Sequence, residues 1–166
     1  FTFSNCTGLT SITIPNSVTS ICMYAFYCCT GLTSITFPNN LSYIGDYAFS
    51  HCINLTSITI PKSVNYIYKE AFSGCKGLTS VTYEGTNDPG GGYSNIFKNC
   101  PNLKEAHVPY NYQDDEFCGL SINKFPAWIF LIISTIVGLF CAIAIPNYCC
   151  DVKIKYDQSS EVDDDT

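Results

Sequence analysis

Apolar residues recur along the first 83 residues at a spacing of 23, and mostly polar residues fill the positions between them. Four columns of this repeat hold the same or a closely similar residue in every copy. They are Phe3, Phe26, Phe49 and Phe72; Cys6, Cys29, Cys52 and Cys75; Leu9, Leu32, Leu55 and Leu78; Ile12, Ile35, Ile58 and Val81. A fixed period of this length predicts that each unit forms one turn of a coil and that the turns stack.

Each unit carries the pattern of two short strands. In the first half, apolar and polar residues alternate from Ser11 to Ile14, which is the period of a half-buried strand. A proline follows at Pro15, Pro38 and Pro61. The second half repeats a shorter apolar pair and predicts a second strand on the opposite wall: Val18 and Ile21, Leu41 and Ile44, Val64 and Ile67. The Leu-x-x-Ile-x-Ile spacing is typical of a leucine-rich-repeat solenoid, and we predict a β-rich solenoid closed by short turns or helical turns.

The regular pattern is interrupted after Tyr83. Residues 84–95 are rich in Gly, Asn, Asp and Pro, which predicts a loop insertion. The repeat recovers from Ile96 onward, so we assign residues 1–109 to the repeats. Residues 110–125 are predicted to form a C-terminal cap and a juxtamembrane linker. Because the chain begins within a repeat, we expect it to be the C-terminal part of a longer protein.

Residues 126–145 form an uncharged apolar stretch. At about 1.5 Å per residue, a helix of this length crosses a hydrocarbon core of about 30 Å. We therefore predict a single transmembrane α-helix after the solenoid. Lys153 and Lys155 follow the stretch and only Lys124 closely precedes it, which favours extracellular repeats and a short acidic cytoplasmic tail at 146–166. The expected location is the plasma membrane.

Composition and charge narrow the classes of function. Of the 166 residues 46% are hydrophobic, and 14 acidic residues outnumber 8 Lys and Arg. Nucleic-acid binding depends on clustered Lys and Arg, so nucleic acid is excluded as a partner. Nothing resembles a Ser/His/Asp arrangement or paired carboxylates, so we predict no catalytic residues, no cofactor and no enzyme activity.

Five of the eleven Cys occupy one repeat column: Cys6, Cys29, Cys52, Cys75 and Cys100. Stacking would bury this column as a ladder of small apolar thiols that can donate to loop carbonyls. The alternative is a metal site or stacked disulfides. Metal ligands must converge on one point, whereas a ladder spaces its members one coil apart, so we predict no metal site. Cys100 and Cys118 are candidates for a disulfide that fixes the cap.

Two kinds of covalent modification follow from the predicted topology. Cys149 and Cys150 come directly after the apolar stretch and are candidates for lipidation. Asn5, Asn40 and Asn54 begin Asn-x-Ser/Thr triplets and are candidates for N-glycosylation. We favour Asn40, which lies in the turn after Pro38, because Asn5 and Asn54 lie beside core positions.

The outward residues of the first-half strands form rows of hydroxyl groups and make up the candidate ligand-binding face. They are Thr10, Ser11, Thr13, Thr33, Ser34, Thr36, Thr56, Ser57, Thr59, Thr79, Ser80 and Thr82. The simplest explanation is that Thr and Ser suit strands that face water. The alternative is a surface that binds a protein or a glycan.

The unit Phe-x-x-Cys-x-x-Leu-x-x-Ile-x-Ile-Pro-x-x-Val-x-x-Ile-x-x-x-Ala resembles the BspA-type leucine-rich repeat over about residues 1–118. The version with one membrane span and a short acidic tail resembles the protist members of this class of surface antigens. The resemblance implies adhesion to host cells, matrix or other microbes, through an unidentified protein or glycan. The alternative function is a surface receptor that mediates uptake or signalling through its tail.

Overall fold

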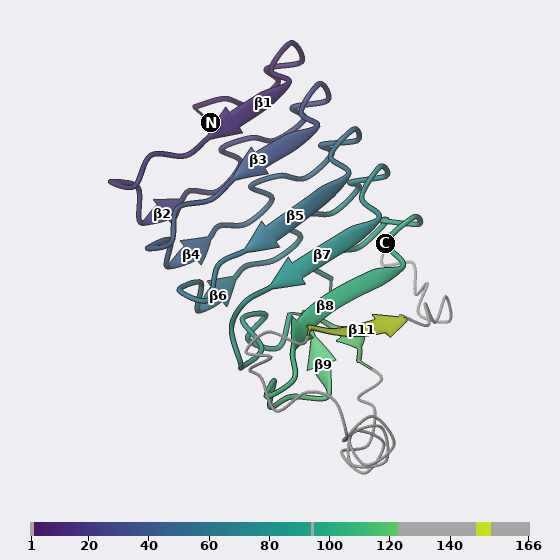
Figure 1. The fold of residues 1–166 in the computed structure, drawn as a ribbon. Coiled ribbons are helices and arrows are strands. Elements are labelled where there is room, and N and C mark those ends of the chain that lie inside the picture. The colour runs from purple at the N-terminus through teal and green to yellow at the C-terminus, as the bar shows by residue number, and fades with distance from the viewer. Residues whose placement is uncertain (1, 94, 123–148, 154–166) are drawn as a thin grey trace, which may run out of the picture.

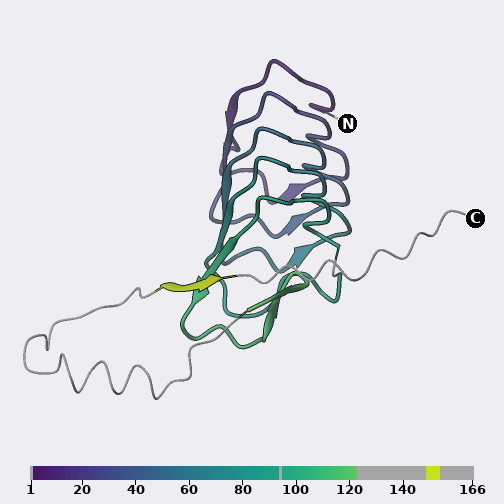
Figure 2. The ribbon, with the colours of Figure 1, turned by 90° about the vertical axis from the view of Figure 1, so that its right-hand side faces the viewer.

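The computed structural model describes residues 2–93, 95–122 and 149–153. Successive turns of the chain stack along one axis, and short strands line two opposite walls of the coil (Figure 1, Figure 2). Within these residues the turns between strands contain no helix. The β-rich solenoid predicted from the period of 23 residues is therefore confirmed.

Parallel strands at the same point of each turn build the two walls. The first wall contains β1 (Ser11–Thr13), β3 (Ser34–Thr36), β5 (Ser57–Ile60), β7 (Ser80–Tyr83) and β8 (Glu105–Pro109). The second wall contains β2 (Ser20–Ile21), β4 (Tyr43–Ile44) and β6 (Tyr66–Ile67). Paired residues are equivalent positions of neighbouring copies, for example Ile12 with Ile35 and Ile44 with Ile67.

Columns of identical side chains fill the space between the walls. Leu32, Leu55 and Leu78 are fully buried, one behind another. The Phe column forms a continuous stack in which neighbouring ring centroids lie 5.2, 5.0, 5.3 and 5.5 Å apart, from Phe3 through Phe26, Phe49 and Phe72 to Phe97. Each unit thus contributes one layer of the core, which explains why stacking is needed to bury it.

The Cys column is a ladder of free thiols that is buried from Cys29 to Cys100, as the sequence predicts, while Cys6 at its start is half-buried. Each thiol from Cys29 onward donates to the carbonyl of the Phe in the preceding coil: Cys29 to Phe3, Cys52 to Phe26, Cys75 to Phe49 and Cys100 to Phe72, at 2.9 to 3.2 Å. Burial raises the pKa of Cys52 to about 12, so this thiol stays protonated at neutral pH.

The insertion at 84–95 takes the place of a second-wall strand in the fourth coil. The described residues of this segment form turns and bends, and Gly91 and Gly92 adopt positive φ angles of 56° and 90°. The backbone N–H of Ile67 in β6 donates to Pro89 O at 2.7 Å. The insertion therefore pairs with the last strand of the second wall.

A small antiparallel hairpin closes the C-terminal end of the core. It consists of β9 (Glu116–Phe117) and β10 (Leu120–Ser121). Phe117 is fully buried, and its ring lies 5.4 Å from the ring of Tyr83 and 6.1 Å from that of Phe97. The Asp88 carboxylate accepts from Cys118 N at 2.8 Å and so fastens the hairpin to the insertion.

A last strand, β11 (Cys149–Lys153), pairs antiparallel with β8 and lies beside it in Figure 1. Within the described ranges, no helix has the length and apolar character to cross a membrane. The apolar stretch at 126–145 lies outside these ranges, as does the predicted tail apart from β11.

The first wall is split between its second and third strands. β1 pairs with β3, and β5 pairs with β7, but β3 and β5 are not hydrogen-bonded to each other. Just before these strands Thr56 N lies 3.5 Å from Thr33 O, whereas the equivalent distances in the neighbouring pairs, Thr33 to Thr10 and Thr79 to Thr56, are 2.9 Å. The inner edges of β3 and β5 are therefore left without a neighbouring strand.

One sequence difference coincides with this split. Gly31 and Gly77 occupy a column where the backbones of neighbouring coils come close, and a Cβ at Gly77 would lie 2.6 Å from Ile53 O. Asn54 occupies the same column in the third coil and donates from its side chain to Thr30 O at 2.8 Å. We infer that the Asn54 side chain keeps the third coil away from the second.

Candidate functional site

The candidate ligand-binding face is the outer surface of the first wall. Ten of its twelve predicted residues are exposed, and Ser80 and Thr82 are half-buried. The register aligns equivalent hydroxyls in rows: Ser11 pairs with Ser34, and Ser57 with Ser80; Thr13 pairs with Thr36, and Thr59 with Thr82. Both rows end at β8, where Glu105 pairs with Ser80 and His107 with Thr82.

The three rows of hydroxyls differ in what they can offer to a ligand. In the row that contains Thr10, the hydroxyls of Thr33 and Thr79 donate to carbonyl oxygens of the preceding coil at 3.0 and 3.1 Å. These hydroxyls help to hold the coils together. In the rows that contain Ser11 and Thr13, no such bond is found among the described residues, and these side chains are exposed apart from the half-buried Ser80 and Thr82.

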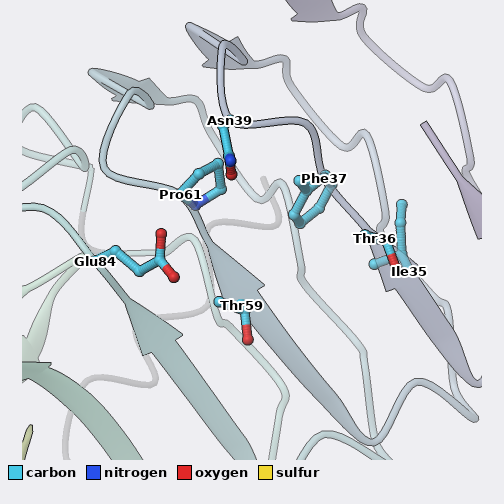
Figure 3. A pocket seen from close by; sticks show the side chains of 7 residues that line it. All are labelled: Ile35, Thr36, Phe37, Asn39, Thr59, Pro61 and Glu84. Carbon is cyan, nitrogen blue, oxygen red and sulfur yellow. The ribbon is translucent and has the colours of Figure 1, made fainter. Parts of the chain in front are cut away.

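A hollow lies on this face where the first wall is split (Figure 3). Its volume is about 220 Å³, and we call it the β3–β5 hollow. Its lining residues come from β3, from β5 and from the turns that follow β3, β5 and β7: Ile35, Thr36, Phe37, Asn39, Thr59, Pro61 and Glu84.

Polar groups of several kinds converge on the β3–β5 hollow. In Figure 3 the Glu84 carboxylate, the Asn39 amide and the Phe37 ring point toward a common space. Glu84 is held in place through its backbone N–H, which donates to Ile60 O at 3.0 Å. Thr36 and Thr59 add hydroxyl groups, and all four polar side chains are exposed. The hollow therefore offers a carboxylate, an amide and two hydroxyls beside an apolar floor.

Sequence reasoning found only Thr36 and Thr59 among these lining residues. For two of the others, Glu84 and Phe37, the signal is a departure from the repeat. Glu84 occupies the column of Pro15, Pro38 and Pro61, and Phe37 occupies a column that holds Ile14 and Ile60. A residue that breaks its column marks a coil with a different local structure.

The three predicted glycosylation residues are all exposed. Asn40 nevertheless donates from Nδ2 to Asn16 O at 2.6 Å, and Asn54, in a different column of the repeat, donates from Nδ2 to Thr30 O at 2.8 Å. Asn5 has a positive φ of 61°. Their use as acceptors stays a prediction.

The predicted cysteine modifications fall on different parts of the structure. Cys100 and Cys118 are buried and both are free thiols, so the disulfide considered from the sequence is not formed here. Cys149 and Cys150 begin β11, whose backbone pairs with β8. Lipidation of these two residues stays a prediction. Among the described residues, no cluster of His, Cys, Asp or Glu could hold a metal ion.

The stacked parallel strands, the Leu and Phe columns and the hydroxyl-bearing outer wall define a leucine-rich-repeat solenoid. The chain belongs to the BspA-type leucine-rich-repeat family, whose model of six repeat copies matches residues 1–123. Solenoids of this class typically serve as binding scaffolds.

Two solved structures illustrate the similarity. A leucine-rich-repeat protein of T. pallidum is 26% identical with a TM-score of 0.51; the match covers 63% of this chain and 58% of that one. A leucine-rich cell surface protein of Faecalibacterium prausnitzii is 25% identical with a TM-score of 0.50, and the match covers 59% of this chain and 31% of that one. No curated protein matches the chain. The chain thus spans only about a third to somewhat over half of these two structures.

Proposed function

We propose that the protein is a cell-surface adhesion protein that binds its ligand on the hydroxyl-bearing face of the first wall. The observation that carries this proposal is the alignment of hydroxyl-bearing residues in two rows, from β1 to β3 and from β5 to β7. The membership of the BspA-type family and the similarity to a bacterial protein described as a cell surface protein support a role outside the cell. Host cells, matrix and other microbes are the proposed targets, with a protein or glycan as the partner.

The proposal includes a membrane anchor at 126–145, with the repeats outside the cell and the tail inside. A bilayer between the repeats and residues 149–153 is incompatible with the pairing of β11 and β8. The anchored protein must therefore leave the outer edge of β8 unpaired. Uptake or signalling through the tail is the competing function, and deletion of residues 147–166 separates it from adhesion, which needs only the face.

The binding face is tested by charge substitutions in the complete chain displayed on a cell. Ser34→Lys and Ser57→Lys each place a long cation among exposed hydroxyls. Asn65→Lys is the control and places the same cation on the exposed residue just before β6, away from the first wall. We expect the first two to reduce saturable binding to host cells by about tenfold or more, because a bulky charge at the centre of an interface must be desolvated. Asn65→Lys should bind like the unchanged protein. Equal binding by all three variants would show that the face is not used.

A further inference from the structure

The β3–β5 hollow offers backbone groups as well as side chains to a ligand. β7 is hydrogen-bonded to β5 on one side and to β8 on the other, whereas β3 pairs only with β1 and β5 pairs only with β7. At the split, the facing edges of β3 and β5 keep N–H and C=O groups that water or a ligand must satisfy. A ligand in the hollow would meet these groups beside the hydroxyls of Thr36 and Thr59.

The side chains of the hollow favour a ligand with many hydroxyl groups. An ionised carboxylate such as that of Glu84 only accepts hydrogen bonds, whereas the Asn39 amide and the two Thr hydroxyls both donate and accept. A hydroxyl group also donates and accepts, so adjacent hydroxyls of one ligand can satisfy this mixed set. Hydrogen bonds from hydroxyls to a carboxylate are among the stronger ones.

The charge and shape of the hollow limit the choice further. No Lys lines it, and Glu84 is its one ionisable side chain, so an anionic ligand would be repelled. Ile35, Phe37 and Pro61 form an apolar floor. The fitting ligand therefore has one apolar face and a rim of hydroxyls without negative charge, which describes a neutral sugar ring.

The dimensions of the site agree with a small ligand. A volume of about 220 Å³ lies below the roughly 300–1,000 Å³ of pockets for drug-sized molecules. The strands of the first wall lie about 4.8 Å apart, so the face covers roughly 20 by 10 Å. That is a few hundred Å², which is less than the roughly 800 Å² that each partner of a standard protein–protein interface contributes.

We propose that the β3–β5 hollow binds a terminal neutral hexose of a glycan. The proposal rests on the adhesive function proposed above and names its ligand. Glu84 accepts hydrogen bonds from adjacent sugar hydroxyls, and Asn39, Thr36 and Thr59 bind the remaining hydroxyls. The apolar face of the ring lies against Ile35 and Phe37.

The test uses the complete 166-residue chain in a detergent without a sugar headgroup. Its binding is measured on immobilised glycans that end in neutral hexoses and on the same glycans capped with sialic acid or sulfate. Glu84→Gln removes the charge and keeps the shape, and Thr59→Val removes one hydroxyl at nearly constant volume. Thr19→Val makes the same change on an exposed residue next to β2, outside the first wall, and it is the matched control.

We expect saturable binding to one or more neutral glycans and none to their anionic forms. Glu84→Gln and Thr59→Val should each weaken binding by about tenfold, because a lost hydrogen bond to a charged or desolvated partner costs about that factor. Thr19→Val should bind normally.

Three results would overturn the proposal, and they differ in what else they affect. Equal loss of binding in Thr19→Val would show that the losses do not come from the hollow, and it would leave the adhesive function in place. Unchanged binding of the chain to host cells stripped of glycans would replace the sugar with a protein ligand and leave the adhesive function in place. Absence of saturable binding to cells and to all glycans would refute both the ligand and the adhesive function.

Discussion

At the scale of single residues, the Cys column links stability to pH. Burial raises the pKa of Cys52 from an ordinary value of 9.0 to about 12 in the folded protein. The folded state therefore keeps a proton that the unfolded chain loses above pH 9, so this thiol destabilises the fold as the pH rises from 9 to 12 and has no such effect below 9. The slope contributed by one such group is at most about 1.4 kcal/mol per pH unit.

Urea unfolding under reducing conditions checks this prediction. We expect the difference in free energy of unfolding between the unchanged protein and Cys52→Ala to be constant from pH 7 to 8.5 and to shrink between pH 9 and 10.5. The variant itself should be less stable by about 1–2 kcal/mol at pH 7, because it loses the thiol and its hydrogen bond to Phe26 O. A constant difference up to pH 10.5 would mean that the folded thiol titrates normally.

Substitution of Gly77 tests how closely neighbouring coils approach one another. Its N–H donates to Ile53 O at 2.8 Å, and an added Cβ would lie 2.6 Å from the same oxygen. Gly77→Ala should therefore cost about 1–3 kcal/mol, since the two backbones must separate. Gly8→Ala is the matched control because a Cβ there meets nothing within 4 Å.

Thermal unfolding of both variants measures the difference. We expect a clearly lower midpoint for Gly77→Ala and a change within about 0.5 kcal/mol for Gly8→Ala, which also loses backbone freedom in the unfolded chain. A similar effect of the two substitutions would contradict the close approach at Gly77.

At the scale of elements, the repeat pattern predicts what every coil shares and misses what one coil does differently. The alternation from Ser11 to Ile14 predicts the strands of the first wall, and the Val18–Ile21 pair predicts those of the second. The split between β3 and β5 is not predictable in this way, because periodic columns describe an average coil. We attribute it to Asn54, which stands where Gly8, Gly31 and Gly77 occupy the other copies.

The same limit applies to the candidate site. The rows of Thr and Ser follow directly from the alternation, but their unequal roles do not, because the bonds of Thr33 and Thr79 to the preceding coil depend on side-chain rotation. The β3–β5 hollow needs Glu84, which lies one coil away from Thr59 along the chain. Only the stacking distance between coils decides whether the two residues meet.

Asn54→Gly tests the proposed cause of the split. The variant restores the glycine column, so we expect β5 to move toward β3 and to form hydrogen bonds along residues 34–36 and 57–59. Asn102 makes the equivalent side-chain bond to Lys76 O at 2.7 Å although β7 and β8 do pair, and there the preceding coil is two residues longer. We attribute this difference to the two added residues, which the coil from Phe26 to Ala48 does not have.

Amide hydrogen exchange measures the outcome of this substitution. Amides on the facing edges of β3 and β5 should exchange more slowly in Asn54→Gly than in the unchanged protein, while the amides between β5 and β7 should exchange at the same rate. Glycan binding should fall as the hollow narrows. Unchanged exchange in β3 and β5 would assign the split to another residue, with Phe37 as the next candidate.

At the scale of the whole molecule, two arrangements compete for the outer edge of β8. In the structure this edge pairs with β11, which thereby becomes the edge strand of the sheet. A membrane span at 126–145 would carry residues 149–153 to the opposite side of the bilayer. The hydrocarbon core is about 30 Å thick, so a strand cannot reach back to β8 once the span has inserted.

Membrane insertion is therefore expected to release β11 from β8. Labelling of the native cysteines shows on which side of the membrane each segment lies. In intact cells an impermeant maleimide should label the exposed Cys22 of the repeats. Cys149 and Cys150 should react only after the membrane is permeabilised, and after hydroxylamine if they carry a thioester-linked lipid. A Cys149→Ser, Cys150→Ser variant identifies their share of the label. Labelling of these two residues from outside the cell would place β11 on the same side as the repeats and would refute the membrane-spanning arrangement, because the chain cannot cross the bilayer once and return within the pairing distance of β8.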